Sequence, residues 1–255
     1  MKILLIAGSA MLLPLLTQAA PAAPDTDNPL PVAPVTLTDV RWTAEPADGA
    51  QDAPRLRLRH GPSNSDTPLD ADRPEFAAAA AALADNAPGP IHFTVSHDAG
   101  TLACTGERTS AYAGKGRCRF TADPHFERQL AARGLAPRQR ATLLAMLMVD
   151  ATIEQADGLI REGVRPENAD DLIAAAALDI TPAYVRDLRS DALVLTRIED
   201  AIACKAMDID GAYVRDLAAA GYHGLSAQDV VAMKAMGITG AYAMAMNRAA
   251  EGNGR

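Results

Sequence analysis

Apolar and polar residues alternate along several short segments in the first half of the chain. In 55–59 arginine alternates with leucine, and 91–95 alternates in the same way. A period of two is typical of a strand with one buried face. Gly106 and Gly114 mark the ends of an expected hairpin loop over 106–115. The elements predicted from this part are strands over 37–43, 55–59, 91–95, 101–105 and 116–120 and helices over 75–84 and from Asp123 to Gly134.

The second half repeats an apolar pattern with a 29-residue period. Eight aligned positions agree over three copies, and an eroded fourth copy lies upstream. The clearest aligned sets are Tyr184, Tyr213 and Tyr242; Ile180, Ile209 and Ile238; Asp171, Asp200 and Asp229; and Ala174, Ala203 and Ala232. The pattern predicts units over about 140–168, 169–197, 198–226 and 227–255. A period of this length is the signature of stacked helical pairs.

Each unit is expected to contain two short helices. Thr181 is a good N-cap for the second helix, and Pro182 suits its first position. Helices of two to three turns are not stable alone, so each unit must pack on the next. The tyrosines could form a row of phenols that contact a ligand, but a repeated core aromatic is the favoured interpretation. The isoleucines are expected in the same core.

The N-terminus has the pattern of a secretory signal peptide. Lys2 precedes an apolar run over 3–16, and cleavage is expected near Ala19 or Ala20. An uncleaved anchor is the alternative. A proline-rich linker is expected over 21–35. The predicted organisation is therefore a signal peptide (1–20), a linker (21–35), an α+β domain with a β-hairpin (36–135) and four helical repeats (136–255). The fold class is α+β, with a small β-rich domain before an all-α, solenoid-like array.

The composition limits the class of partner. The formal net charge is −8, and aromatic residues make up only 4 % of the chain. An acidic surface argues against nucleic acid as a partner, because phosphate binding needs a basic stripe. Beyond the signal peptide, no segment is long and apolar enough to cross a membrane. We expect a periplasmic protein.

The three cysteines divide into a pair and a single residue. Cys104 and Cys118 flank the predicted hairpin symmetrically, and pairing them also sets Leu102 opposite Phe120. Cross-strand β-carbons are close enough to bridge, so a disulfide is expected in an oxidising compartment, with two buried thiols as the alternative. Cys204 aligns with apolar positions of the repeat and is expected as a buried small residue. A free thiol for pairing or oxidant sensing is the sharper alternative.

No catalytic set emerges from the remaining chemistry. The histidines lack metal-ligand spacing, so neither a metal nor a cofactor is expected. Ser96, His97 and Asp98 are adjacent, and consecutive strand side chains point to opposite faces, so they cannot relay a proton. This segment is interpreted as a polar strand end.

The last unit is rich in methionine. Met244 stands where the third unit has Arg215. The methionines form either an adaptable surface for self-association or partner capture, or a wider buried stripe. The residues concerned are Met233, Met236, Met244 and Met246.

The segments 180–188 and 219–229 resemble the repeats appended to membrane metallopeptidases of the β-lactam-sensor type. The hairpin around Gly100 and Gly114 resembles the segment that often precedes those repeats, so the resemblance covers roughly 91–255. The peptidases carry a zinc-binding His-Glu-x-x-His motif, which this chain lacks. The resemblance implies an accessory sensing or binding portion without the enzyme.

These observations favour an exported, non-catalytic protein-interaction or scaffold module. Its expected partner is an envelope protein or a second copy of the chain. The alternative is a sensor for a small cell-envelope ligand, either a wall fragment or a β-lactam, which rests mainly on the resemblance. An enzyme with a non-standard site is a third hypothesis without positive support.

Overall fold

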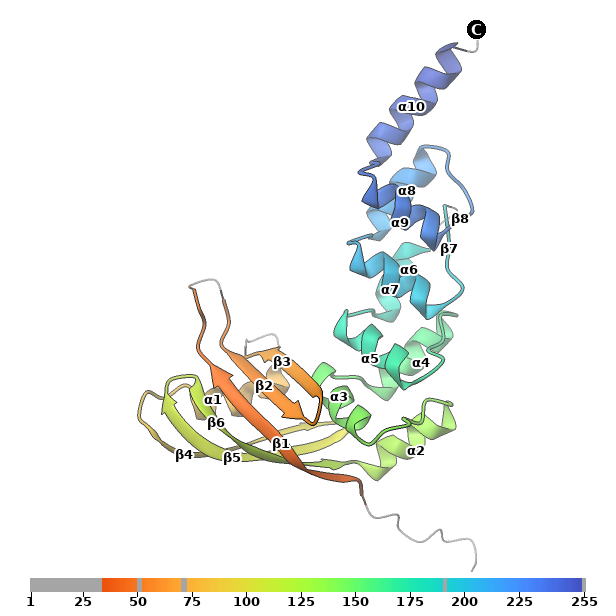
Figure 1. The fold of residues 1–255 in the computed structure, drawn as a ribbon. Helices are drawn as coiled ribbons and strands as arrows, with labels where there is room; N and C mark the ends of the chain where they lie inside the picture. The colour runs from red at the N-terminus through yellow and green to blue at the C-terminus, as the bar shows by residue number, and fades with distance from the viewer. Residues whose placement is uncertain (1–33, 50–51, 70–72, 190–191, 254–255) are drawn as a thin grey trace, which may run out of the picture. The chain divides into compact units, whose positions relative to one another are not determined.

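A six-stranded antiparallel sheet occupies the first part of the chain, and helices follow it (Figure 1). The structure is a computed structural model that describes residues 34–49, 52–69, 73–189 and 192–253. The chain is α+β, as its pattern predicts. The expected signal peptide and residues 21–33 of the expected linker lie outside the described residues. The predicted domain bounds stay a prediction.

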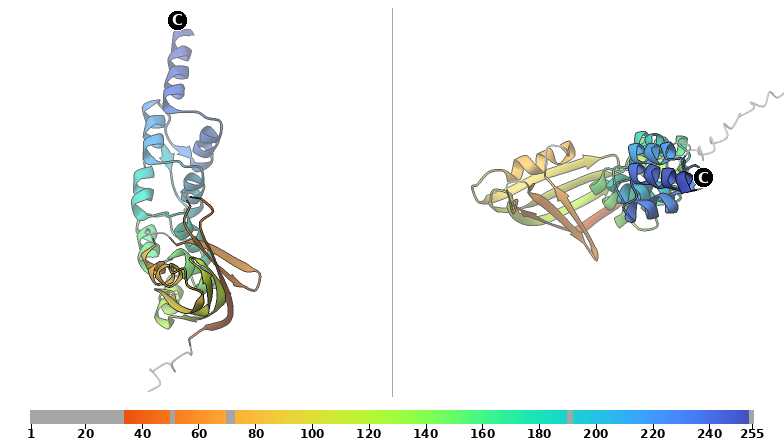
Figure 2. Two further views of the ribbon diagram at one scale, coloured as in Figure 1. Left: turned by 90° about the vertical axis from the view of Figure 1, so that its left-hand side faces the viewer. Right: turned by 90° about the horizontal axis from the view of Figure 1, so that it is seen from above.

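The strand order in the sheet is β3-β2-β1-β6-β5-β4, and every neighbouring pair is antiparallel. The short helix η1 (Pro74–Phe76) continues into α1 (Ala77–Leu83), and both pack against β4 (Figure 2). The strands are β1 (Thr36–Glu45), β2 (Arg55–His60), β3 (Ser63–Pro68), β4 (Gly89–His97), β5 (Gly100–Ser110) and β6 (Ala113–Ala122).

The predicted ten-residue hairpin loop is wrong. β5 and β6 remain paired through Gly106 and Gly116, and only two residues separate the strands. The glycines make room for Trp42 instead of forming a turn. A β-carbon on either glycine would collide with the Trp42 ring and with the neighbouring backbone. The indole Nε1 donates a hydrogen bond of 3.0 Å to the Thr105 carbonyl, so the ring is held on the glycine surface.

The disulfide predicted between Cys104 and Cys118 is present. Cys104 lies opposite Cys118, and Leu102 lies opposite Phe120, in the expected register. All four side chains are buried. The bridge therefore fastens the two long strands of the hairpin inside the core and not at its tip.

The core of the sheet extends into the helical part of the chain. It contains alternate residues of the strands together with Phe76 and Leu83 from the covering helices. Leu143, Met146 and Leu147 of α3 (Ala141–Val149) belong to the same core, and α3 contacts β3, β5 and β6. A second apolar core lies among the helices that follow.

The helices contact one another in two series. In one series α3 contacts α5, α5 contacts α7, and α7 contacts α9; in the other the order is α2, α4, α6, α8 and α10. A two-residue parallel pair joins β7 (Leu193–Val194) to β8 (Leu225–Ser226). The helix bounds are α2 (Pro124–Ala132), α4 (Ile153–Arg161), α5 (Ala169–Ala177), α6 (Pro182–Leu188), α7 (Ile198–Ala206), α8 (Gly211–Ala219), α9 (Ala227–Ala235) and α10 (Gly240–Asn253).

Side-chain caps start the second series of helices. The Thr181 hydroxyl accepts a hydrogen bond from the Tyr184 backbone N–H, and Pro182 occupies the first position, as predicted. The side chains of Thr152, Asp210 and Thr239 likewise each accept a hydrogen bond from the backbone N–H of the residue three positions later. These caps satisfy N–H groups that the helix itself leaves unbonded. The four capping positions are evenly spaced and follow the period of the repeat.

Candidate functional site

Two of the three predicted tyrosines, in α6 and α8, bond to backbone carbonyls 25 residues further along the chain. The Tyr184 hydroxyl donates a hydrogen bond of 2.7 Å to the Ile209 carbonyl, and Tyr213 donates one of 2.7 Å to Ile238. Burial raises the pKa of both phenols, with nearby acidic groups adding to the effect at Tyr184. A protonated hydroxyl bonded to a carbonyl acts as a structural donor. These two tyrosines are therefore packing residues.

A lysine side chain lies over each of these rings. Lys205 Nζ is 4.7 Å from the Tyr184 ring centroid, and Lys234 Nζ is 4.8 Å from that of Tyr213. At these distances the ammonium is attracted to the face of the ring. Each of these two contact sites therefore combines a phenol, a carbonyl acceptor and an ammonium. We call such a site a junction: one consists of Tyr184, Lys205 and Ile209, and the other of Tyr213, Lys234 and Ile238.

Gln155 stands one repeat period before Tyr184 and makes the corresponding bond. Its Nε2 donates a hydrogen bond of 3.2 Å to the Ile180 carbonyl. The backbone carbonyls of Ile180, Ile209 and Ile238 therefore each accept a hydrogen bond from a side chain that lies 25 residues earlier. Ile180 and Ile209 are buried, and Ile238 is half-buried. The sequence pattern missed Gln155 because glutamine differs from tyrosine in size and polarity.

Tyr242 differs from the other two tyrosines, so the core position predicted for it is wrong. Its ring is 54 % exposed. Among the described residues, no group accepts a bond from its hydroxyl and no cation lies over its ring. Only its backbone N–H is engaged, with Thr239 Oγ1 at 3.1 Å. In the described chain no helix pair covers this position.

The methionines do not form one surface. Met233 is buried in the second core, which corrects its assignment to a partner surface. It sits on the inward side of α9, where Cys204 sits in α7. Met236, Met244 and Met246 are exposed. Of these three, Met246 lies one helical turn beyond Tyr242 on α10, whereas Met244 lies on a different face of that helix.

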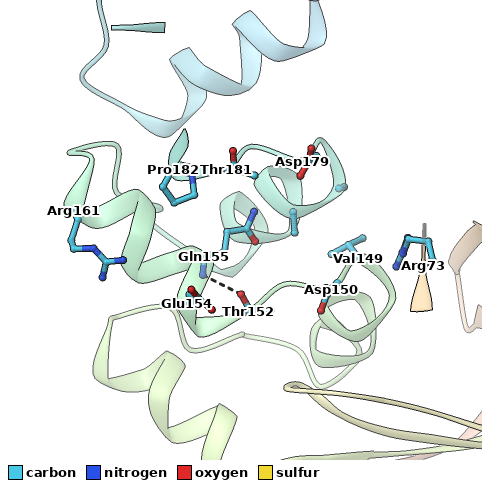
Figure 3. A pocket seen from close by; sticks show the side chains of 12 residues that line it. Arg73, Val149, Asp150, Thr152, Glu154, Gln155, Arg161, Asp179, Thr181 and Pro182 are labelled. Atoms are coloured by element: carbon cyan, nitrogen blue, oxygen red, sulfur yellow. Dashed lines mark hydrogen bonds between the residues drawn. The ribbon is translucent and has the colours of Figure 1, made fainter. Parts of the chain in front are cut away.

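A cleft of about 690 Å³ lies beside Gln155 (Figure 3). Arg73 and Arg161 lie on opposite sides of Gln155 in this view, with Thr152 and Thr181 between them. The lining residues are Arg73, Val149, Asp150, Thr152, Glu154, Gln155, Arg161, Ala176, Ala177, Asp179, Thr181 and Pro182. The cleft is therefore built from the ends of α3 and α5, both ends of α4, the start of α6, and one arginine that precedes η1.

The cleft lies at the junction where both large side chains are replaced. Position 155 is glutamine instead of tyrosine, and position 176 is alanine where the later junctions have Lys205 and Lys234. Ala176 lines the cleft. The space that the lysine stem and the phenol ring fill elsewhere is open here. Sequence reasoning missed this cleft because it follows from residues that depart from the repeat.

The cleft carries charges of both signs and a buried amide oxygen. Asp150, Glu154 and Asp179 contribute carboxylates. Burial raises the pKa of Asp150, although His97 opposes that shift. The Gln155 Oε1 atom is buried and has no hydrogen-bond partner among the described residues. An unsatisfied buried acceptor is costly, so a donor from a ligand or water would be favourable here.

Next to the cleft, four ionisable side chains meet in a cluster. The His97 Nδ1 atom lies 2.6 Å from Asp150 Oδ1, and His97 Nε2 lies 3.9 Å from Glu75 Oε1. Arg73 pairs with Glu75 and donates a hydrogen bond of 2.9 Å to the Met148 carbonyl. The cluster joins the end of β4 to the turn between α3 and α4.

His97 is therefore more than the polar strand end that the sequence suggested. Its partners come from segments far away in sequence, and no local pattern points to them. Both ring nitrogens face carboxylates, and His97 does not line the cleft. Ser96 is engaged elsewhere, since its hydroxyl lies 3.3 Å from that of Thr101. This geometry gives the imidazole a role in holding the sheet to the helices.

Cys204 is buried in the second core. Burial raises the pKa of its thiol to about 11, with a smaller contribution from Asp200. This environment favours the interpretation as a small apolar residue over that of a sensing thiol. Among the described residues, no three His, Cys, Asp or Glu side chains are grouped so that they could hold a metal ion.

None of the helices in the described ranges has the length and apolar character that a membrane crossing requires. Compared with models of protein families, with curated proteins and with solved structures, the chain matches none. The resemblance to the β-lactam-sensor repeats stays a prediction, and the function has to be inferred from the contacts and the cleft.

Proposed function

We propose that this chain is an exported, non-catalytic interaction module of the bacterial cell envelope. In this proposal residues 140–255 form a solenoid-like array of four 29-residue units, which binds a protein partner. Stacked units of this kind offer a continuous binding surface and do not require catalytic residues.

Backbone geometry that recurs once in every unit supports the array. Asp150, Asp179, Asp208 and Gly237 all have positive φ, between 51° and 72°. Each directly precedes a residue whose N–H bonds to the carbonyl five positions earlier. This is the pattern of a helix that ends in a left-handed residue. The capping positions of the second helices follow the same interval.

The observation that carries the proposal is the exposed ring of Tyr242. The three preceding positions in its series, Gln155, Tyr184 and Tyr213, each bond to a carbonyl of the next helix pair. Tyr242 belongs to the same series but is exposed, and Met246, one turn further along α10, is exposed as well. An exposed aromatic ring and an exposed methionine one turn apart on a helix are suited to a helical partner.

The environments of the ionisable groups support a non-catalytic role. His97 lies between Asp150 and Glu75 and not at the cleft, and the Thr152 and Thr181 hydroxyls cap helices. The disulfide supports export, since such bonds persist in oxidising compartments.

Site-specific photo-crosslinking tests the partner surface. A photoreactive phenylalanine at position 242 of the full exported chain should give one discrete adduct with an envelope protein. The same residue at position 194, where Val194 is 52 % exposed on another part of the chain, is the control. Equal labelling from both positions, or no adduct from position 242, would contradict the proposal.

A small envelope ligand is the second candidate, and the cleft beside Gln155 is the observation that favours it. Its volume of about 690 Å³ lies within the range of small-molecule sites. The resemblance to sensor repeats suggests wall fragments or β-lactams. A rise in Tm with either class, measured on the full chain, would support this candidate, and no shift with any of them would count against it.

A further inference from the structure

We propose that the cleft beside Gln155 binds a primary ammonium group carried on a short peptide. The ammonium takes the place that a lysine side chain fills at the next two junctions of the chain. This inference rests on the second candidate function, the small envelope ligand, and it does not depend on a partner at Tyr242.

At the junctions of Tyr184 and Tyr213, the space that corresponds to the cleft holds a lysine ammonium. Lys205 and Lys234 place their ammonium groups over Tyr184 and Tyr213, and Lys234 Nζ also donates a hydrogen bond of 3.0 Å to the Asp208 carbonyl. At the first junction the aligned residue is Ala176, which lines the cleft. The helices still meet with the same side-chain-to-carbonyl bond, from Gln155 to Ile180. The side-chain-to-carbonyl bond is thus kept, whereas the phenol ring and the lysine are both absent.

Acceptor groups also lie at the cleft, including the counterpart of the aspartate whose backbone carbonyl binds Lys234. Asp150 precedes position 176 by the same interval that separates Asp208 from Lys234, and both aspartates have positive φ. Asp150 and Asp179 line the cleft, and the buried Gln155 Oε1 atom has no partner among the described residues. An ammonium carries three donors and no acceptor. It therefore matches the buried Gln155 Oε1 atom, which lacks a donor in the described chain, and the Asp179 carboxylate in the same cleft.

The two arginines of the cleft refine the ligand class. Arg73 is already paired with Glu75 and bonded to the Met148 carbonyl, so its charge is partly compensated. Arg161 lies on the opposite side of Gln155 from Arg73 (Figure 3). A carboxylate on the same ligand would face Arg161 while the ammonium occupies the acceptor side. Amine-bearing peptides with a carboxylate therefore fit better than an anion alone.

Such an amine has two sources, a lysine of a protein and a diamino acid of a wall peptide. The test is calorimetric titration of the full mature chain with two probes, a lysine tripeptide and a wall tripeptide that contains diaminopimelate. Each probe has a control in which the side-chain amine is acetylated. We expect at least one free-amine probe to bind about tenfold more tightly than its acetylated form, and the tighter probe identifies the source.

The matched variant is Ala176→Lys, which restores the residue found at the other two junctions. It should fold, because lysine is accommodated at the aligned positions, and it should reduce binding of the free amine at least tenfold. Ser110→Lys on the exposed end of β5 adds the same charge elsewhere and should leave binding unchanged.

Equal binding of acetylated and free probes, or unchanged binding by Ala176→Lys, would overturn the ammonium proposal. So would the absence of binding by either probe at millimolar concentration. If wall fragments or β-lactams still raise the Tm of Ala176→Lys as much as that of the wild type, the small-ligand function stands and only this site assignment fails. If they raise neither, the small-ligand function fails as well.

Discussion

Arg133 and Asp157 form a two-point ion pair that joins the end of α2 to α4. Arg133 Nε lies 2.6 Å from Asp157 Oδ1, and Arg133 Nη2 lies 2.7 Å from Oδ2. The parallel geometry is the strong form of an arginine–carboxylate contact. It ties α2, which follows the sheet, to α4, the next helix of the same series.

Asp157→Asn should lower the free energy of unfolding at pH 7 by about 0.5–1 kcal/mol, because the pair is partly exposed. The hydrogen bonds from Arg133 hold the pKa of Asp157 below its usual value. A depressed carboxyl pKa stabilises the fold above the unfolded pKa near 3.8, and the contribution is lost as pH falls through the folded pKa. Urea unfolding at pH 7 and pH 3 should therefore show a difference that shrinks in acid. Glu167→Gln, which removes an exposed carboxylate, is the control; a difference independent of pH would contradict the expectation.

Removing the tyrosine hydroxyl should lower stability at Tyr184 and Tyr213, where it is bonded, but not at the exposed Tyr242. Tyr184→Phe and Tyr213→Phe should each destabilise the chain by about 0.5–1.5 kcal/mol, because each leaves an isoleucine carbonyl without its donor. Tyr242→Phe, the built-in control, should leave stability unchanged within error. The measurement is urea or thermal unfolding of the three variants. Equal losses in all three would show that the hydroxyl of Tyr242 is engaged after all.

Most of the strands were predictable because their buried faces alternate. The exceptions are β3 (Ser63–Pro68), whose residues are mostly polar and show no apolar alternation, and the two-residue strands β7 and β8. The glycines near Trp42 led to the wrong prediction of a hairpin loop over 106–115. Glycine signals both turns and close packing, and the sequence alone does not separate the two.

The candidate site was less predictable than the fold. The tyrosine positions followed from the repeat, but the cleft comes from Gln155 and Ala176, where the repeat is broken. The pairing of His97 with Asp150 depends on how the sheet meets α3, which no local spacing encodes. Periodicity identifies residues that pack alike, whereas the cleft and the charged cluster arise where the chain departs from it.

Replacing Cys104 and Cys118 by serine should lower the free energy of unfolding by about 3 kcal/mol, because the bridge closes a loop that restricts the unfolded chain. The two cysteines lie 14 positions apart in sequence. Both sulfur atoms are buried, so the double variant also loses some packing. Unfolding with and without a reductant measures the effect. The reductant should change the wild type and leave the double variant unaffected; a wild type that is equally stable when reduced would contradict the prediction.

Cys204 should resist thiol reagents while the chain is folded. Its side chain is buried, and its pKa is raised to about 11, so little thiolate forms at pH 8. Titration with a chromogenic disulfide should detect no thiol in the native oxidised chain and one in urea. Cys204→Ala serves as the control and should give none in either condition. Rapid labelling of the native wild type would instead support the sensing thiol.

Gly158→Ala should destabilise the chain although alanine favours helices. Gly158 is buried within α4, and a β-carbon there would overlap the Pro182 ring at the start of α6. The helix-propensity gain of about 1 kcal/mol is smaller than the cost of the collision, about 1–3 kcal/mol. The net loss should disappear, or become a gain, when the same substitution is made in a Pro182→Ala background. Unfolding free energies of the four members of this cycle test the contact directly. An increase in stability from Gly158→Ala alone would show that α4 and α6 do not approach as closely at this point as the structure has them.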